Sequence, residues 1–305
     1  MKKFEGILLC TDFDGTIATG AVISPENRAA VKYFTENGGL FTIVSGRKQI
    51  FFTRPNDLPL LTAPPVCLNG AMIIDHGKIV REILMEPNDV YTAIRFFCEN
   101  ASIKRLLIYN DIRVTKLIRH KYGFAYSFID ENDVTSDEIP VDEICARVVD
   151  GRVITGIPDV DDALSKGIYK AVATSTAKTC TEEEMARMEA EAIERSNGRT
   201  FICRSWPHGI EFLHRTATKG GAVRFLKEYT GAHLSVAIGN YENDTPMIMD
   251  ADVGVAVGDS SPDALAAADV ITVSCAEHAV ADLINNRLEF IIESYKTHQH
   301  ENRKD

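Results

Sequence analysis

The stretch GILLCTDFDGT, residues 6–16, decides the fold. Its first five residues form an uninterrupted apolar run, which is typical of a strand buried on both faces of a parallel sheet. Asp12 and Asp14 follow that strand directly. Because ligands of open parallel sheets bind at the carboxyl ends of the strands, the same stretch predicts where a functional site lies.

Similar apolar runs alternate with helical patterns towards both ends of the chain. The predicted strands are residues 6–10, 39–44, 65–68, 234–238 and 253–257, and the predicted helices are residues 25–37, 219–229, 245–250 and one opened by Ser261 and Pro262. Ser24 and Ser261 each precede a proline, a combination that favours a capped helix start. This alternation predicts an α/β fold with a doubly wound, Rossmann-like parallel-sheet core.

The middle of the chain has a different pattern. Its predicted elements are helices at residues 87–100 and from the capping box Thr181 to Glu184, strands at residues 104–109, 113–118, 167–174, 200–204 and 209–213, and a turn at Asn110-Asp111. Strands joined by short turns indicate antiparallel pairs. We therefore expect an inserted α+β domain at residues 85–213, within a core domain made of residues 1–84 and 214–305.

The composition excludes several classes of protein. The 305 residues carry 33 basic and 44 acidic side chains, a net charge of -11, which argues against a nucleic-acid partner. No stretch approaches the roughly 20 apolar residues of a membrane span, and the first apolar run meets Asp12 too early for a signal peptide. The seven cysteines lie at least 23 positions apart, so we expect free thiols and a cytoplasmic protein. The oligomeric state stays open.

Four predicted strands end at polar residues. The first is followed by Asp12, Asp14 and Gly15, the second by Ser45, Gly46 and Arg47, the third by Asn69, and the fourth by Asn240, Asn243 and Asp244. Any one of these groups could be an ordinary loop or helix cap. Because parallel strands bring their carboxyl ends to one edge of a sheet, the four groups together predict a single site.

The carboxylates at that edge require a counter-charge. Asp12 and Asp14 lie two residues apart, and Asp244 is expected from the neighbouring loop. Their repulsion would raise the pKa of at least one of them, and a hard divalent cation such as Mg²⁺ removes that cost. Mg²⁺ also binds phosphate, which an acidic protein repels. The alternative for the Asp-x-Asp-Gly pattern is an ordinary tight turn.

Taken together, these motifs resemble the haloacid dehalogenase superfamily of phosphatases. The residues that carry the resemblance are Asp12-Phe13-Asp14-Gly15-Thr16, Ser45, Lys219 and the pair Asn243-Asp244. The insert is similar to the type IIB cap of the Cof-type branch, through Asn69-Gly70-Ala71, Ile168-Tyr169-Lys170 and Ile210-Glu211-Phe212. The resemblance covers nearly the whole chain.

The resemblance implies a role for each motif residue. Asp12 is expected to attack phosphorus and form an aspartyl-phosphate, and Asp14, with its side chain free, to act as general acid and then base. Ser45 and Lys219 are expected to contact the phosphoryl oxygens. The implied Mg²⁺ ligands are Asp12, the backbone carbonyl of Asp14, Asn240 and Asp244, and the implied phosphate- or substrate-binding residues are Gly15, Ser45, Gly46, Arg47, Asn69, Lys219 and Asn243.

One position departs from the family pattern. The last motif usually begins with Gly-Asp, and this chain has Gly239-Asn240. An amide oxygen can coordinate Mg²⁺ but brings no negative charge, so metal affinity is expected to fall or Asp244 to take a larger part.

The sequence thus predicts an Mg²⁺-dependent phosphatase for small phosphorylated metabolites, with sugar phosphates suggested by the resemblance. A phosphomutase of the same superfamily and a weakly catalytic sugar-phosphate sensor are the alternatives. The chain has no GxGxxG after its first strand and no GxxxxGK[ST], which disfavours a nicotinamide dehydrogenase or a P-loop nucleotidase. Substrate choice is expected from loops of the insert, such as residues 122–127.

Overall fold

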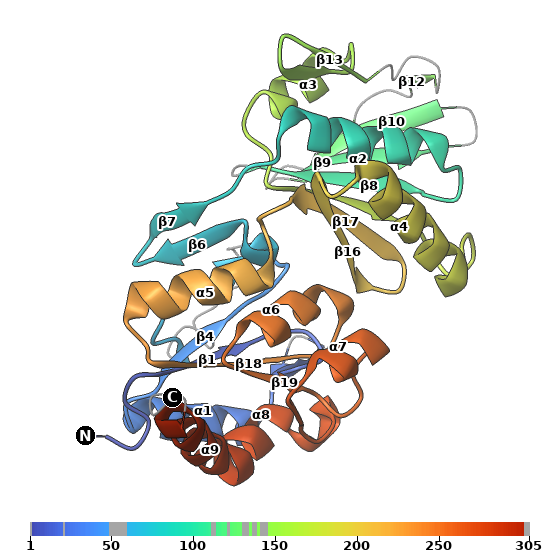
Figure 1. Ribbon diagram of the computed structural model, residues 1–305. Coiled ribbons are helices and arrows are strands. Elements are labelled where there is room, and N and C mark those ends of the chain that lie inside the picture. The colour runs from blue at the N-terminus through green and yellow to red at the C-terminus, as the bar shows by residue number, and fades with distance from the viewer. Residues whose placement is uncertain are drawn as a thin grey trace. The chain divides into compact units, whose positions relative to one another are not determined.

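The computed structural model describes residues 2–20, 22–48, 60–110, 114–120, 123–129, 134–135, 139–140 and 146–301. The chain divides into two compact units, which we call unit 1 (Met1–Val80 and Thr218–Asp305) and unit 2 (Arg81–Ala217). Each has its own sheet (Figure 1). The predicted boundaries at 84/85 and 213/214 each differ by four residues from the divisions at 80/81 and 217/218.

Unit 1 is built on a five-stranded parallel sheet. Its strands, in spatial order, are β20 (Val270–Ile271), β19 (Val253–Ala256), β18 (Leu234–Gly239), β1 (Ile7–Thr11) and β4 (Leu40–Ile43). From β1 the chain adds β4 on one side, and later β18, β19 and β20 on the other. This is the predicted doubly wound arrangement, and β1 is buried along its whole length because helices cover both faces.

The helices that the structure describes in unit 1 are α1 (Pro25–Glu36), α5 (Lys219–Thr230), α6 (Thr245–Asp250), α7 (Pro262–Ala267), α8 (Ala279–Asp282) and α9 (Leu288–Glu301). Three of them, α1, α5 and α7, begin at a side-chain cap. The side chains of Ser24, Thr218 and Ser261 each accept a hydrogen bond from a backbone N–H in the first turn of their helix. Among the described residues, no helix has the length and hydrophobicity needed to cross a membrane.

The prediction that residues 65–68 form a strand of the parallel sheet is wrong. β5 (Val66–Cys67) pairs antiparallel with β6 (Met72–Asp75), and β7 (Lys78–Glu82) completes a separate three-stranded sheet. A single parallel bridge joins Val66 to Val44 beyond the end of β4. The strand is short because Leu68 and Asn69 take φ values of 52° and 56°, which turn the chain into a 3-10 helix, η3 (Leu68–Gly70). A small hairpin, β2 (Ala18–Thr19) and β3 (Val22–Ile23), follows β1.

Unit 2 is an α+β unit. Its eight-stranded sheet has the order β11 (Val134–Thr135), β10 (Gly123–Ile129), β9 (Val114–Arg119), β8 (Arg105–Tyr109), β15 (Lys170–Thr174), β17 (Gly209–His214) and β16 (Thr200–Trp206), with β12 (Ile139–Pro140) also paired to β10. These strand pairs are antiparallel, as the sequence predicts. A separate hairpin is formed by β13 (Arg147–Val149) and β14 (Arg152–Ile154).

Three helices in the described part of unit 2 form its core with one face of this sheet. They are α2 (Pro87–Glu99), α3 (Pro158–Leu164) and α4 (Glu182–Ser196), and α4 begins at the predicted Thr181–Glu184 capping box. The prediction of a loop near residues 122–127 is wrong for the part that the structure describes, because residues 123–127 lie in β10. Tyr122, Asp111 of the predicted turn and Arg113 at the start of a predicted strand lie outside the described residues.

Candidate active site

Lys219 joins two carboxylates that the sequence predicts at the site. It occupies the first position of α5, and its Nζ donates to Asp12 Oδ1 at 2.6 Å and to Asp244 Oδ1 at 2.5 Å. Asp12 follows β1, and Asp244 ends the 3-10 helix η5 (Glu242–Asp244) that follows β18. β1 and β18 are neighbours in the sheet, so their carboxyl ends bring the two aspartates to the same lysine.

The burial of this cluster sets its electrostatics. The side chains of Lys219, Asp12 and Asp244 are 1%, 8% and 1% exposed. Burial, and then the charge of Asp244, raises the pKa of Asp12 to about 7, although Lys219 acts in the opposite direction. Burial alone would lower the pKa of Lys219, but the charges of both carboxylates and their hydrogen bonds raise it above its usual value. The cluster therefore holds a firmly charged lysine and a carboxylate that a second cation would help to ionise.

The loop after β18 is folded around Asp244. Its second oxygen, Oδ2, accepts hydrogen bonds from the backbone N–H groups of Asn240 at 2.8 Å and Tyr241 at 3.0 Å. With Lys219 on Oδ1, both oxygens of Asp244 are engaged. This carboxylate thus fixes the loop that carries Asn240 as well as the position of the lysine.

The side chain of Asp14, which is predicted to stay free of the metal, is paired with Arg47. Arg47 donates from Nε to Asp14 Oδ2 at 2.7 Å and from its terminal NH2 to Oδ1 at 2.5 Å, a bidentate pair. The guanidinium also lies over the ring of Phe13, 4.9 Å from its centroid. Because the guanidinium occupies both carboxylate oxygens, Asp14 must leave this pair or rearrange within it before either oxygen can reach a leaving group.

The residues after β4 and in η3 form a second group near the strand ends. Ser45 is buried, and its Oγ accepts a hydrogen bond from the backbone N–H of Arg47 at 3.2 Å. Asn69 Oδ1 accepts from Asn243 Nδ2 at 3.2 Å, and a Cβ on Gly46 would lie 3.0 Å from the same oxygen. The structure therefore brings Ser45, Gly46, Asn69 and Asn243 together.

Asn240 packs against the turn that follows β1. Its Oδ1 accepts a hydrogen bond from Thr16 Oγ1 at 3.1 Å. Gly15 has a φ of 76°, and a Cβ on it would lie 2.6 Å from Asn240 Nδ2, so a side chain there would displace the amide. The sequence motif includes Thr16 but assigns it no role. In the structure its hydroxyl orients the amide of Asn240, the residue that differs from the family pattern.

The donor set is suited to Mg²⁺. Asp12, Asp244 and Asn240 offer hard carboxylate and amide oxygens at this edge of the sheet. The described residues contain no cluster of three or more Asp, Glu, His or Cys side chains that could hold a metal ion without other ligands. Mg²⁺ does not need such a cage, because it keeps several waters and binds through one or two carboxylates plus substrate phosphate. The buried, partly ionised Asp12 provides the charge that a cation would relieve.

Gly70 holds η3 against the start of α5. Its φ is 97°, and an added Cβ would lie 2.2 Å from the backbone oxygen of Thr218, immediately before Lys219. We expect Gly70→Ala to lower the free energy of unfolding by about 1–3 kcal/mol more than Gly77→Ala, measured by urea unfolding. Gly77 is the matched control, since its φ is 78° and nothing lies within 4 Å of its Cβ position. Equal costs for the two variants would contradict this contact.

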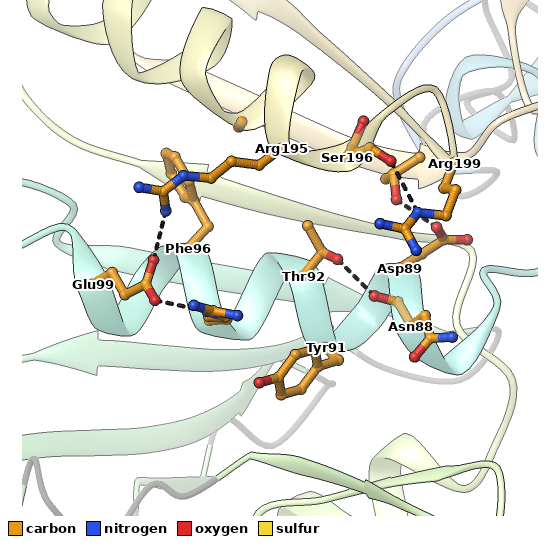
Figure 2. A pocket seen from close by; sticks show the side chains of 12 residues that line it. Asn88, Asp89, Tyr91, Thr92, Phe96, Glu99, Arg195, Ser196 and Arg199 are labelled. Carbon is orange, nitrogen blue, oxygen red and sulfur yellow. Dashed lines mark hydrogen bonds and ion pairs between the residues drawn. The ribbon is translucent and has the colours of Figure 1, made fainter.

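A groove lies between α2 and α4, and its lining residues are all different from the residues of the candidate active site. It has a volume of about 810 Å³ and is made only of residues of unit 2 (Figure 2). On its wall, Glu99 pairs with Arg95 at 2.7 Å and with Arg195 at 2.9 Å. None of the predicted catalytic residues lines this groove. The candidate active site is therefore the cluster of Lys219, Asp12 and Asp244 at the strand ends of unit 1.

Comparison with known proteins identifies the class that this fold and cluster define. The family model of haloacid dehalogenase-like hydrolases matches residues 9–284. The chain therefore belongs to this family and is an enzyme, a hydrolase. The superfamily that its motifs resemble and the predicted hydrolase class are confirmed.

Individual relatives cover nearly the whole chain. A Haemophilus influenzae protein provisionally named a phosphatase is 26% identical over 286 residues, which span 91% of this chain and 96% of that protein. The structure of a subclass IIB sugar phosphatase matches with a TM-score of 0.65 and 18% identity, covering 91% of this chain and 97% of that one. A haloacid dehalogenase-like hydrolase from B. subtilis gives 0.66 and 19%, covering 92% and 99%. At these identities the two structures confirm the fold class.

Proposed function

We propose that this enzyme is an Mg²⁺-dependent phosphatase that hydrolyses small phosphorylated metabolites, with sugar phosphates as the expected class. The observation that carries the proposal is the buried Lys219, held between Asp12 and Asp244 at the carboxyl ends of β1 and β18. A buried cation beside a carboxylate nucleophile suits the transfer of a negatively charged phosphoryl group. The names of the relatives support the same reaction class.

In the first half of the proposed reaction, a carboxylate oxygen of Asp12 attacks phosphorus and the bond from phosphorus to the ester oxygen breaks. Asp14 gives a proton to the departing oxygen, so an alcohol and an aspartyl-phosphate result. Ser45 Oγ and Lys219 Nζ donate hydrogen bonds to the phosphoryl oxygens. The Asp14–Arg47 pair has to loosen for this step, and the substrate phosphate is a competing anion for the guanidinium.

In the second half, Asp14 takes a proton from a water molecule, and the water oxygen attacks phosphorus. The bond between phosphorus and Asp12 breaks, which returns the carboxylate and releases inorganic phosphate. Asp14 is then protonated again for the next turnover. Two displacements at phosphorus replace one difficult attack by water.

The metal in this proposal is held by Asp12, the backbone carbonyl of Asp14, Asn240 and Asp244. When bound, Mg²⁺ neutralises charge on the phosphoryl oxygens and favours the ionised form of Asp12. We propose that the inserted domain predicted at residues 85–213 acts as the cap that selects the leaving group. A cytoplasmic location stays part of the proposal, supported by the free thiols of the cysteines that the structure describes.

The first test is release of inorganic phosphate from 4-nitrophenyl phosphate, with Mg²⁺ and with excess chelator. We expect turnover that depends on Mg²⁺. A sensor is the second candidate, because the uncharged amide of Asn240 is tied to Thr16 and adds no negative charge at the metal. Saturable, Mg²⁺-dependent binding of a sugar phosphate without any release of phosphate would favour the sensor and contradict the phosphatase.

Variants of the last motif test the proposed metal ligands. Asn240→Asp adds a negative charge and should lower the Mg²⁺ concentration for half-maximal activity about 3- to 10-fold, which corresponds to roughly 1 kcal/mol of Coulomb energy. Asp244→Asn removes a charge and should raise it. Asp259→Asn is the control, because Asp259 belongs to the Gly-Asp pair after β19 and accepts from the backbone of Cys275. Unchanged midpoints in both site variants would place the metal elsewhere.

A further inference from the structure

The sheet of unit 2 has two faces of different character. One face packs against α2 and α4 through alternate strand residues, for example Ile108 and Ala171 (Figure 1). Because successive side chains of a strand point to opposite sides, the residues between them lie on the other face, which we call the second face. The second face carries Leu107, Lys116, Ile118, Ala125, Ser127, Lys170, Val172 and Glu211.

Within the described part of unit 2, the side chains of Ser127 and Lys116 on the second face have no partner. The side chain of Ser127 is fully buried, and its Oγ makes no hydrogen bond. Lys116 is partly exposed and has no hydrogen bond or ion pair within the described part of the chain. The strand register places Lys116 directly opposite Ser127, which brings their Cβ atoms to about 5 Å. An ammonium group and an unused hydroxyl donor therefore stand side by side.

Lys170 and Glu211 on this face neutralise one another, and Arg105 is an exposed cation at the start of β8. Lys170 Nζ donates to Glu211 Oε2 at 2.7 Å, and Ser205 Oγ donates to Glu211 Oε1 at 2.6 Å. Glu211 lies three strands away from Lys116, about 14 Å at the usual strand spacing, and is already paired. At physiological salt that distance exceeds the screening length of about 8 Å. Within the part of the chain that the structure describes, Lys116 thus has no ion-pair partner, although the net charge of the protein is -11.

The surroundings of this pair are apolar. Leu107 lies opposite Lys116 on β8, and Ile118 lies opposite Ala125 across β9 and β10. All three apolar side chains are partly exposed. A ligand that suits this surface combines one anionic group with a small apolar body.

We propose that Lys116 and Ser127 form an anion-binding site on the second face of unit 2. The site takes a carboxylate or phosphate group, with Lys116 supplying the charge and Ser127 Oγ donating a hydrogen bond. The apolar body of the ligand packs on Leu107, Ile118 and Ala125. The anionic group belongs either to the substrate, as a second charge besides the phosphate that is cleaved, or to a separate small molecule. The first of these sources rests on the proposed phosphatase function.

Benzoate is the probe for binding, because it joins a carboxylate to an apolar ring and has no phosphate to hydrolyse. We expect a benzoate titration of the full chain to shift the NMR signals of residues 116 and 127. Lys116→Met should weaken benzoate binding at least about 10-fold, and Ser127→Ala about 3- to 10-fold. Ser127→Ala removes a hydroxyl without a partner, so the protein should stay folded and at least as stable.

Lys178→Met is the matched control, because Lys178 is an exposed lysine elsewhere in unit 2. Benzoate binding should be unchanged in this variant. Equal affinity in the wild type and in Lys116→Met would overturn the proposal. So would the absence of benzoate-induced shifts at residues 116 and 127 up to the solubility limit of the probe.

Turnover of two aryl phosphates separates the sources of the anion. If the anion belongs to the substrate, 4-carboxyphenyl phosphate should have a lower KM than phenyl phosphate, and Lys116→Met should remove the difference. If the two KM values are equal while benzoate still binds at Lys116, the site serves a separate ligand. If neither ester is hydrolysed while benzoate binds, the proposed function fails and the anion site stands.

Discussion

Asp12→Asn is expected to lower the rate of phosphate release by at least about 10³-fold, because an amide oxygen cannot replace the carboxylate as a nucleophile. The substituted side chain has nearly the same shape, and its oxygen can still accept from Lys219 Nζ, as Asp12 Oδ1 does at 2.6 Å. The loss should therefore appear in kcat rather than in folding. Initial rates with 4-nitrophenyl phosphate at saturating Mg²⁺ measure it.

Stability provides a second readout for the same variant. The pKa of Asp12 is raised to about 7 from an unfolded value near 3.8, so the ionised carboxylate opposes folding above pH 4 and increasingly up to pH 7. Asp12→Asn removes this penalty, and without Mg²⁺ the variant should be at least as stable as the wild type near neutral pH. Asp259→Asn, the same chemical change outside the cluster, should leave the rate unchanged. A rate above one tenth of the wild-type value in Asp12→Asn would contradict the role of this residue.

Lys219→Met is expected to cost both stability and activity. The substitution leaves Asp12 and Asp244 buried, with side chains 8% and 1% exposed. It removes the ammonium group that contacts Oδ1 of each carboxylate. Breaking a buried ion pair on one side costs about 3–5 kcal/mol, and loss of a transition-state cation should lower kcat at least about 10²-fold. Urea unfolding and initial rates measure the two effects.

Lys227→Met on the same helix is the matched control. Lys227 Nζ lies 2.6 Å from Asp252, but the two side chains are 30% and 19% exposed. A pair with that much solvent contact contributes about 0–1 kcal/mol, so this variant should unfold nearly as the wild type does. In an Asp12→Asn background, Lys219→Met should cost less than in the wild type, since one carboxylate is already neutral. A loss below about 1 kcal/mol in the single variant would contradict the proposed electrostatic role.

The sheet of unit 1 could be predicted from local patterns. β1 is apolar up to Thr11 and β18 is apolar apart from Ser235, and each strand is buried at every position because helices cover both faces. Ser24 before a proline caps α1 through the N–H of Asn27, as that sequence favours. These features depend on neighbours in the sequence, which is why the sequence alone predicts them.

Two hairpins were missed although their local signals are present. Between β6 and β7, His76 and Gly77 take φ values of 44° and 78°, and between β13 and β14, Asp150 and Gly151 take 49° and 71°. Two consecutive residues with positive φ are the requirement of a type I′ turn, and Asp-Gly is among its preferred sequences. The flanking strands are short, and none of them alternates strictly between apolar and polar residues, so the strand signal is weak.

The side-chain pairs of the site could not be predicted in the same way. Arg47 lies 33 residues from Asp14, and Lys219 lies 207 residues from Asp12. Sheet topology predicts which loops share an edge but not which cation takes which carboxylate. Arg47 as a substrate-binding residue stays a prediction, and its pair with Asp14 is the contact that the sequence did not predict.

The central claim is that Asp12 carries the phosphoryl group during turnover. Its most direct test is to quench the wild-type enzyme with acid during hydrolysis of 4-nitrophenyl phosphate and to reduce the product with borohydride, which converts an aspartyl-phosphate to homoserine. The proposed mechanism predicts homoserine at position 12, found by peptide mass spectrometry, and none when substrate is omitted. Steady phosphate release with an unmodified Asp12, or with the modification at another aspartate, would contradict it.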